Sequence, residues 1–371
     1  MPVTLKDIAE RVGYSITTVS RALAGYDDVA ESTRQLILKT AEEMGYRPNA
    51  TARRLRARRT DTIGFVIPTH GPRFSDPFFS ELLAGIGNEA ARWELDLLVS
   101  TRAPGEEELA AYQRMVTERR VDGLLVVRTR RQDPRIAYLL EKGFPFVAFG
   151  RSDLGADFPY LDVDGRQGVR ELTEHLISLG HRRIGYISAP LDLMFASHRL
   201  EGYKDALEAH GIPLDERLVV IGRLTEQSGY EAGRALLERE EPPTAIIACN
   251  DLMALGVISA AQSLGLQVGR NVAVAGFDDI PLAAHAQPPL TTVRQPIYEI
   301  GRRICQMLIQ LLREGSPEEP HVILRPRLVV RESCGSTRPK GGETDDAELQ
   351  TYPQQTIRSI PNPVVDKGGV R

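Results

Sequence analysis

The chain has 371 residues, of which 42% are hydrophobic and 26% charged, and its net charge is −4. This composition is that of a globular protein, and the length allows two or three domains and excludes a small disulfide-stapled fold. Three well-separated cysteines suit a reducing cytoplasm, and the first residues lack the apolar core of a signal peptide. No run approaches the roughly 18 apolar residues of a membrane span. We therefore expect a cytoplasmic protein with no contact to a membrane.

The charge is unevenly distributed along the chain. Residues 1–60 contain 11 Lys or Arg against 7 Asp or Glu, whereas the remainder contains 35 against 43. Within 46–60 there are six arginines and no acidic residue. A basic head on an acidic body indicates that the head meets a polyanion.

Residues 1–45 have the pattern of three short helices. Thr4 can cap the first, Gly13 ends it, Ser15 can cap a second over 16–23, and Ser32 and Gln35 form a capping box for a third. This arrangement is typical of a helix-turn-helix DNA-binding domain, although a three-helix cap with a polar face is the alternative. The side chains expected to reach DNA are Thr4, Ser15, Ile16, Thr17, Thr18, Ser20 and Arg21.

From residue 61 to 335, apolar strand patterns alternate with amphipathic helices. The strands are expected at 62–67, 95–99, 123–127, 144–149, 183–188, 218–221, 244–249 and 272–276. Strands of this kind, separated by helices, predict parallel sheets covered on both faces. We expect an α/β core of two doubly wound subdomains, approximately 61–160 plus 292–320 and 161–291 plus 321–335, followed by a disordered tail at 336–371.

An enzyme is the main competing class for a doubly wound core. Gly85, Gly87 and Ala90 match a dinucleotide-binding fingerprint, but they lie inside a helical pattern instead of following a strand, which removes the mechanism. A nucleophile elbow and a Walker loop are absent, and the seven histidines show no metal-ligand spacing. We therefore expect no catalysis, no cofactor and no metal, with a nucleotide-dependent enzyme as an unfavoured alternative.

Many short motifs occur in the order found in one family of bacterial proteins. They are TLKDIAERVG (4–13), TVSRAL (18–23), GYRPNATARRL (45–55), VDG (121–123), GHRRIG (180–185), PTA (243–245), NDLMALG (250–256), GFDD (276–279), PLTTV (289–293) and RES (331–333). With them the chain resembles the LacI/GalR family of ligand-responsive transcription repressors. The resemblance implies a dimeric DNA binder whose core is similar to a periplasmic sugar-binding protein.

In that family the segment matching 46–60 is a hinge that folds when dimer and operator meet. The resemblance implies that Asn49 caps a short hinge helix and that Leu55 is a wedge between base pairs in the minor groove. The other hinge residues expected at the DNA are Ala52, Arg53 and Arg56. A solvated basic linker is the alternative.

The resemblance also implies an effector site between the subdomains. Arg199 matches the family arginine that holds ligand oxygens, and Asn250 and Asp278 follow strands at their carboxyl ends. Asn250 could instead only cap a helix, and Asp278 could be only a turn residue. Phe78, Phe79 and Phe195 are expected to contact the ligand, with core packing as their alternative.

These features predict a repressor of a carbohydrate-utilisation operon that is released or tuned by a sugar or oligosaccharide. A purine or other small molecule is the alternative effector, but purine-responsive relatives have polar residues where this chain has Leu193 and Phe195. The expected DNA is a double-stranded, pseudo-palindromic operator, because a two-fold symmetric protein reads a two-fold symmetric site. We expect a nucleoid-associated homodimer, since the tail lacks the leucine heptad of four-chain relatives.

Overall fold

The computed structural model describes residues 3–46, 59–69 and 76–335. The predicted tail and most of the predicted hinge, including Asn49, Ala52, Arg53, Leu55 and Arg56, lie outside these residues. In the described part of the chain, no helix has the length and apolar character that crossing a membrane requires.

Three helices form the head, α1 (Leu5–Val12), α2 (Ile16–Leu23) and α3 (Glu31–Glu43), as predicted. Thr4 caps α1 in a capping box with Asp7, and the Ser15 hydroxyl accepts a hydrogen bond from the Thr18 amide at 3.0 Å. Gly13 ends α1 in the left-handed conformation, with φ at 73°. The helices pack around a small core of Ile8, Ala9, Val19, Ala22, Val29, Ile37 and Ala41.

The predicted capping box of the third helix is wrong. Helix α3 begins at Glu31 after the residue Ala30, which provides no side-chain cap, so Ser32 already lies inside the helix. Gln35 reaches back to Glu31, with 2.7 Å between its Nε2 and the carboxylate Oε1. A favourable pair at positions i and i+4 thus replaces the expected cap.

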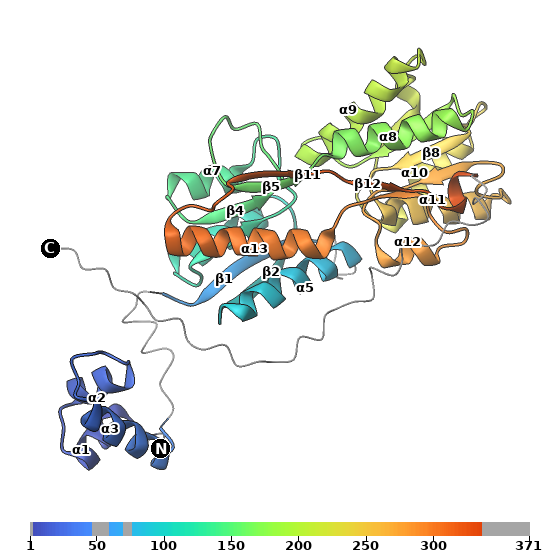
Figure 1. The fold of residues 1–371 in the computed structure, drawn as a ribbon. Helices are drawn as coiled ribbons and strands as arrows, with labels where there is room; N and C mark the ends of the chain where they lie inside the picture. Colours follow the sequence, from blue (N-terminus) through green and yellow to red (C-terminus); the bar gives the residue numbers. More distant parts are fainter. Residues whose placement is uncertain (1–2, 47–58, 70–75, 336–371) are drawn as a thin grey trace.

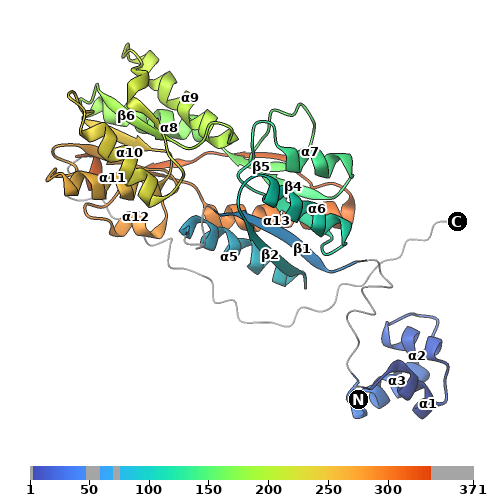
Figure 2. The ribbon, with the colours of Figure 1, turned by 180° about the vertical axis from the view of Figure 1, so that it is seen from behind.

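The first subdomain is built on a parallel sheet of six described strands in the order β11-β5-β4-β3-β1-β2. Their bounds are β1 Thr62–Pro68, β2 Asp96–Arg102, β3 Gly123–Val126, β4 Phe146–Phe149, β5 Tyr160–Val163 and β11 His321–Leu324. Helices α5 (Pro77–Arg92) and α13 (Ile297–Glu314) cover one face, and α6 (Glu106–Thr117) and α7 (Pro134–Glu141) cover the other (Figure 2). Strand β2 is an edge strand and remains partly exposed.

The second subdomain has a parallel sheet in the order β7-β6-β8-β9 among its described strands. The bounds are β6 Ile184–Ser188, β7 Val219–Ile221, β8 Ala245–Ala248 and β9 Ala273–Ala275. One face packs on α8 (Gly165–Ser178) and α9 (Met194–Ala209), the other on α10 (Glu226–Leu237) and α11 (Asp251–Ser263). The short elements are η1 (Glu216–Leu218), α12 (Pro281–His285) and η2 (Glu332–Cys334).

The predicted boundary between the subdomains is wrong in two places. Strand β11, expected in the second subdomain, pairs with β5 and forms the edge of the first sheet. Strand β10 (Thr292–Arg294), expected in the first, pairs antiparallel with β12 (Arg327–Val329) beside the second sheet. The chain therefore passes between the subdomains after β5, between β10 and α13, and between β11 and β12, and Figure 1 shows the last of these connections.

Helices α5 and α13 approach each other closely at two glycines. A methyl group on Gly85 would lie 2.0 Å from the Tyr298 carbonyl oxygen, and one on Gly301 would lie 2.3 Å from that of Leu82. Gly85 is thus required for helix packing, because any side chain would separate the two helices. The apparent dinucleotide fingerprint lies wholly inside α5, as its helical pattern predicted.

Candidate ligand cleft and nucleic-acid interface

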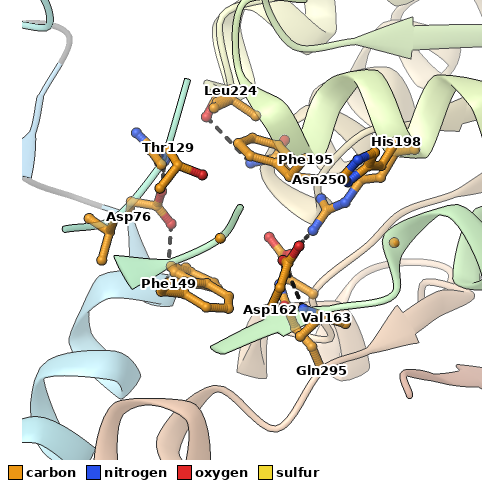
Figure 3. Close-up of a pocket in the computed structure, with 17 residues that line it drawn as sticks. Asp76, Thr129, Phe149, Asp162, Val163, Phe195, His198, Leu224, Asn250 and Gln295 are labelled. Carbon is orange, nitrogen blue, oxygen red and sulfur yellow. Dashed lines mark hydrogen bonds and ion pairs between the residues drawn. The ribbon is translucent and has the colours of Figure 1, made fainter. Parts of the chain in front are cut away.

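A cleft of about 700 Å³, partly open to solvent, lies between the two subdomains at the carboxyl ends of their strands. Figure 3 shows Asp76, Thr129 and Phe149 on one side and Phe195, His198 and Asn250 on the other. Parallel sheets direct loops and helix starts toward this edge, which makes it the usual ligand position in doubly wound folds.

Aromatic rings form the apolar part of the cleft. Phe78 at the start of α5 stacks on Phe149 at the end of β4, with ring centroids 6.2 Å apart and an angle of 16° between the planes. Phe195 lines the cleft from α9. Phe79 does not line it: its side chain is 1% exposed and packs into the core against Phe65. The prediction for Phe79 is therefore wrong, and the core alternative holds.

Arg199 supplies the main cationic group of the cleft. Its guanidinium lies 3.5 Å from the centroid of the Phe277 ring and 4.8 Å from that of Phe195. Nη1 donates to the Cys249 carbonyl oxygen at 2.5 Å, while the buried Nε has no acceptor among the described residues. Arg199 is thus held in place by aromatic faces and retains an N–H for another group.

Asp278 lies opposite Arg199, with 3.6 Å between its Oδ1 and the arginine Nη2. Gln295 donates from Nε2 to the same Oδ1 at 2.6 Å, and its own buried Oε1 has no donor among the described residues. Burial raises the pKa of the Asp278 carboxyl, against the opposing effect of Arg199. The floor of the cleft therefore offers both a donor, from Arg199, and an acceptor, from Gln295.

Asn250 caps helix α11, which was the alternative to its predicted ligand contact. Its Oδ1 accepts from the Met253 amide at 3.1 Å, and Nδ2 lies 3.5 Å from the Leu224 carbonyl oxygen. The side chain still lines the cleft, so one hydrogen of its amide group remains for a ligand.

Sequence reasoning missed an ion pair on the first subdomain's side of the cleft. Asp76 caps α5 by accepting from the Phe78 amide at 3.1 Å, and Arg128 Nη2 donates to its other oxygen at 2.7 Å. The signals were present: Asp76 precedes a proline at a predicted helix start, and Arg128 follows a predicted strand.

A second polar group near the mouth of the cleft was also missed. Arg151 donates from Nε to Asp162 at 2.7 Å, and its Nη2 lies 3.1 Å from His198 Nδ1. Burial and the charge of Arg151 lower the pKa of His198, so the ring is neutral near pH 7 and Nδ1 accepts. This contact joins the first subdomain to helix α9 of the second.

The backbone also bridges the cleft directly. The Met194 amide donates to the Thr129 carbonyl oxygen at 2.9 Å, and the Arg131 amide donates to that of Asp192 at 2.8 Å. These bonds make an isolated antiparallel bridge between Arg130 and Leu193. The two subdomains are thus held together on the cleft side as well as by the three connecting segments.

On the head, Ile16, Thr17 and Arg21 are exposed along or at the end of α2. Ser20 is half-buried, and the hydroxyls of Ser15 and Thr18 lie 2.9 Å apart in the cap of that helix. Thr4 caps α1 and donates its own hydroxyl hydrogen to Asp7 at 2.8 Å. Contact of all these residues with DNA stays a prediction.

Asp122 fixes Thr60 and Asp61, with which the core begins, by hydrogen bonds. Its Oδ1 accepts from the Thr60 amide at 2.7 Å and its Oδ2 from the Asp61 amide at 2.8 Å. The end of the predicted hinge is therefore fixed to the loop before β3.

Comparisons with known proteins agree with both halves of the chain. The model of the lacI family of bacterial regulatory proteins matches residues 4–49, and that of a periplasmic binding protein-like domain matches 173–334. The regulator AglR of Rhizobium meliloti is 38% identical over 340 residues, which are 90% of this chain and 95% of that protein. The regulator CelR of Thermobifida fusca is 37% identical over 336 residues, or 89% and 98% of the two chains.

Solved structures show the same likeness. A complex of CelR with cellobiose has a TM-score of 0.69 at 35% identity and covers 89% of this chain and 99% of its own. The lac repressor dimer bound to operator and an anti-inducer has a TM-score of 0.78 at 28% identity, with 91% and 100% covered. The chain therefore belongs to the lacI family of bacterial regulatory proteins and is a helix-turn-helix transcription regulator.

Proposed function

We propose that this regulator represses a carbohydrate-utilisation operon and that a sugar bound in the cleft releases or tunes it. It acts as a homodimer on a pseudo-palindromic operator, is found in the cytoplasm on the nucleoid, and catalyses no reaction. Two-fold symmetry of the dimer would be mirrored in the half-sites of the DNA.

One observation carries the choice of a sugar: stacked rings and unpaired buried polar atoms share one cleft. Phe78, Phe149 and Phe195 line the cleft, and aromatic rings suit the C–H surface of a pyranose ring. Arg199 Nε needs an acceptor and Gln295 Oε1 needs a donor. A hydroxyl group can be either, so a neutral polyol fits both without bringing a net charge.

The relatives support the same choice. CelR has been solved with cellobiose, and the lac repressor as a dimer on its operator. By this likeness Leu55 would be the minor-groove wedge, with Asn49, Ala52, Arg53 and Arg56 beside it, and Thr60 and Asp61 would connect the hinge to the core at Asp122.

The test is to sequence genomic DNA fragments captured by the purified full-length protein, and then to titrate that complex with cellobiose, other neutral sugars and purines. We expect a recurring pseudo-palindrome near sugar-utilisation genes and a change in DNA affinity with a sugar. No enrichment of any sequence would contradict the DNA-binding role. Stabilisation by a purine, with no response to any sugar, would contradict the effector class.

A further inference from the structure

Arg21, at the end of α2, is held by an acidic residue of the following loop. Its Nε donates to Asp28 Oδ1 at 3.0 Å, and its Nη2 pairs with Asp28 Oδ2. The flat face of the same guanidinium lies over the Tyr26 ring, 5.0 Å from the centroid. Both the edge and the face of the group are thus fixed by residues of one short loop.

This pairing leaves one edge of the guanidinium available. Arginine has five N–H donors in a planar fork, and Asp28 takes the edge formed by Nε and Nη2. No described residue forms a hydrogen bond or ion pair with the edge formed by Nη1 and the second hydrogen of Nη2. Two parallel donors at that spacing match the O6 and N7 acceptors that guanine presents in the major groove.

The loop that carries Asp28 is itself anchored to the head. Arg34 of α3 donates from Nη2 to the Tyr26 carbonyl oxygen at 2.7 Å, and the Tyr26 amide donates to that of Arg21 at 3.1 Å. Val29, next to Asp28, is 8% exposed and belongs to the core of the head. The loop that positions Asp28 is therefore held by contacts within the head itself.

We propose that Asp28 is a positioning residue that orients Arg21 to read a guanine in each half-site. The inference rests on the proposed DNA-binding function of the head. An exposed ion pair contributes little to the stability of the fold, so the main effect of Asp28 is to set the orientation of the Arg21 side chain. Without Asp28 the long, flexible side chain of Arg21 could turn to a phosphate, a contact that carries no sequence information. The carboxylate also repels phosphates, which weakens binding to unrelated DNA.

The experiment measures the affinity of the full-length protein for its captured operator and for operators changed at each base pair in turn. The variants are Asp28→Ala, Asp28→Asn and Arg21→Ala, with Asp27→Ala as the matched control, because Asp27 is the neighbouring exposed carboxylate and its loss removes the same charge. We expect Asp28→Ala to reduce discrimination at one G·C pair in each half-site by roughly tenfold. Asp27→Ala should leave that discrimination unchanged, and Asp28→Asn should lie between.

The double variant separates positioning from general electrostatics. Arg21→Ala should abolish the preference at the same base pair, and adding Asp28→Ala to it should have no further effect there. Equal effects of Asp27→Ala and Asp28→Ala would overturn the inference, as would tighter operator binding by Asp28→Ala with the guanine preference intact. A wild-type protein without any sequence preference would overturn the proposed function itself.

Discussion

The guanidinium of Arg199 and the carboxyl group of Asp278 face each other on the floor of the cleft, 3.6 Å apart and both buried. A hydrogen bond fixes each side chain: Arg199 donates to the Cys249 carbonyl oxygen, and Asp278 accepts from the Gln295 amide group. A ligand therefore meets polar groups whose directions are already set, which reduces the ordering cost of binding.

The arginine fork, and not its charge alone, should be needed for the ligand. Arg199→Lys keeps a cation but loses the planar donors, and it should weaken sugar binding at least tenfold, about 1.4 kcal/mol or more. Isothermal titration with the identified sugar measures this. Arg166→Lys, at an exposed arginine paired with Asp205, is the control. DNA binding without sugar should survive in both variants, and unchanged sugar affinity of Arg199→Lys would place the ligand elsewhere.

The contribution of Asp278 to the stability of the folded protein should fall as the pH rises above about 4. Burial raises the pKa of its carboxyl above the ordinary 3.8, so the folded protein keeps a proton that the unfolded chain has lost. Unfolding then releases a proton and becomes easier at higher pH. Asp278→Asn should reduce this slope by up to about 1.4 kcal/mol per pH unit, seen as a flatter plot of Tm against pH.

Two features bear on the control for that measurement. Asp251 is a second buried carboxyl with a raised pKa, so some slope should remain in Asp278→Asn. Glu240→Gln removes an exposed carboxylate and should leave the wild-type slope intact. Identical slopes in wild type and Asp278→Asn would contradict the assignment.

The backbone bridge across the cleft should contribute to ligand affinity. Met194→Pro removes the N–H that donates to Thr129, while α9 accepts proline at this first position and the preceding Leu193 is already extended. Loss of one such bond, about 0.5–1.5 kcal/mol, should weaken sugar binding by roughly two- to tenfold in a titration. Glu226→Pro, at the first position of α10, provides the control. Equal affinities of the two variants would show that the bridge does not favour the bound state.

The crossing of α5 and α13 should tolerate no side chain at Gly85. Gly85→Ala places a methyl group against the Tyr298 carbonyl and should cost about 1–3 kcal/mol, lowering Tm by several degrees. Gly87 lies two residues further along the same helix, and a methyl group there would have no neighbouring atom within 4 Å. Gly87→Ala should therefore leave Tm unchanged or raise it slightly, since alanine favours helix. A similar loss in both variants would point to the helix itself instead of the crossing.

The repeating strand and helix patterns sufficed to predict eight of the ten described strands of the two parallel sheets, because those strands are apolar runs between helices. Strands β5, β10, β11 and β12 were not predictable in this way. Each has only three or four residues and includes a polar side chain, so it finds its partner through the tertiary fold. Residues 321–324 therefore gave no indication of which subdomain they join.

In the cleft as well, some residues were predictable from the sequence and others became part of the site only through packing. Phe78 and Phe79 are adjacent and chemically identical, yet about 100° of helix rotation sends one to the cleft and the other to the core. Gln295 carried no motif, and only its position beside Asp278 makes it part of the site. Arg199 was found because it stands in a recognisable run, not because its aromatic surroundings were visible.

The chain returns to the first sheet only with β11 and α13, so during synthesis the second sheet can form before the first sheet is complete. Strands β6 to β9 lie between residues 184 and 275 and can pair as soon as they emerge. Strand β5 ends at Val163, but its outer neighbour β11 ends at Leu324, and the covering helix α13 is also made late. At about 5–20 residues per second, that wait lasts on the order of ten seconds or more. During this time the first subdomain of the nascent chain exposes the unpaired edge of β5 and the apolar face that α13 later covers. Such features are recognised by chaperones and drive aggregation.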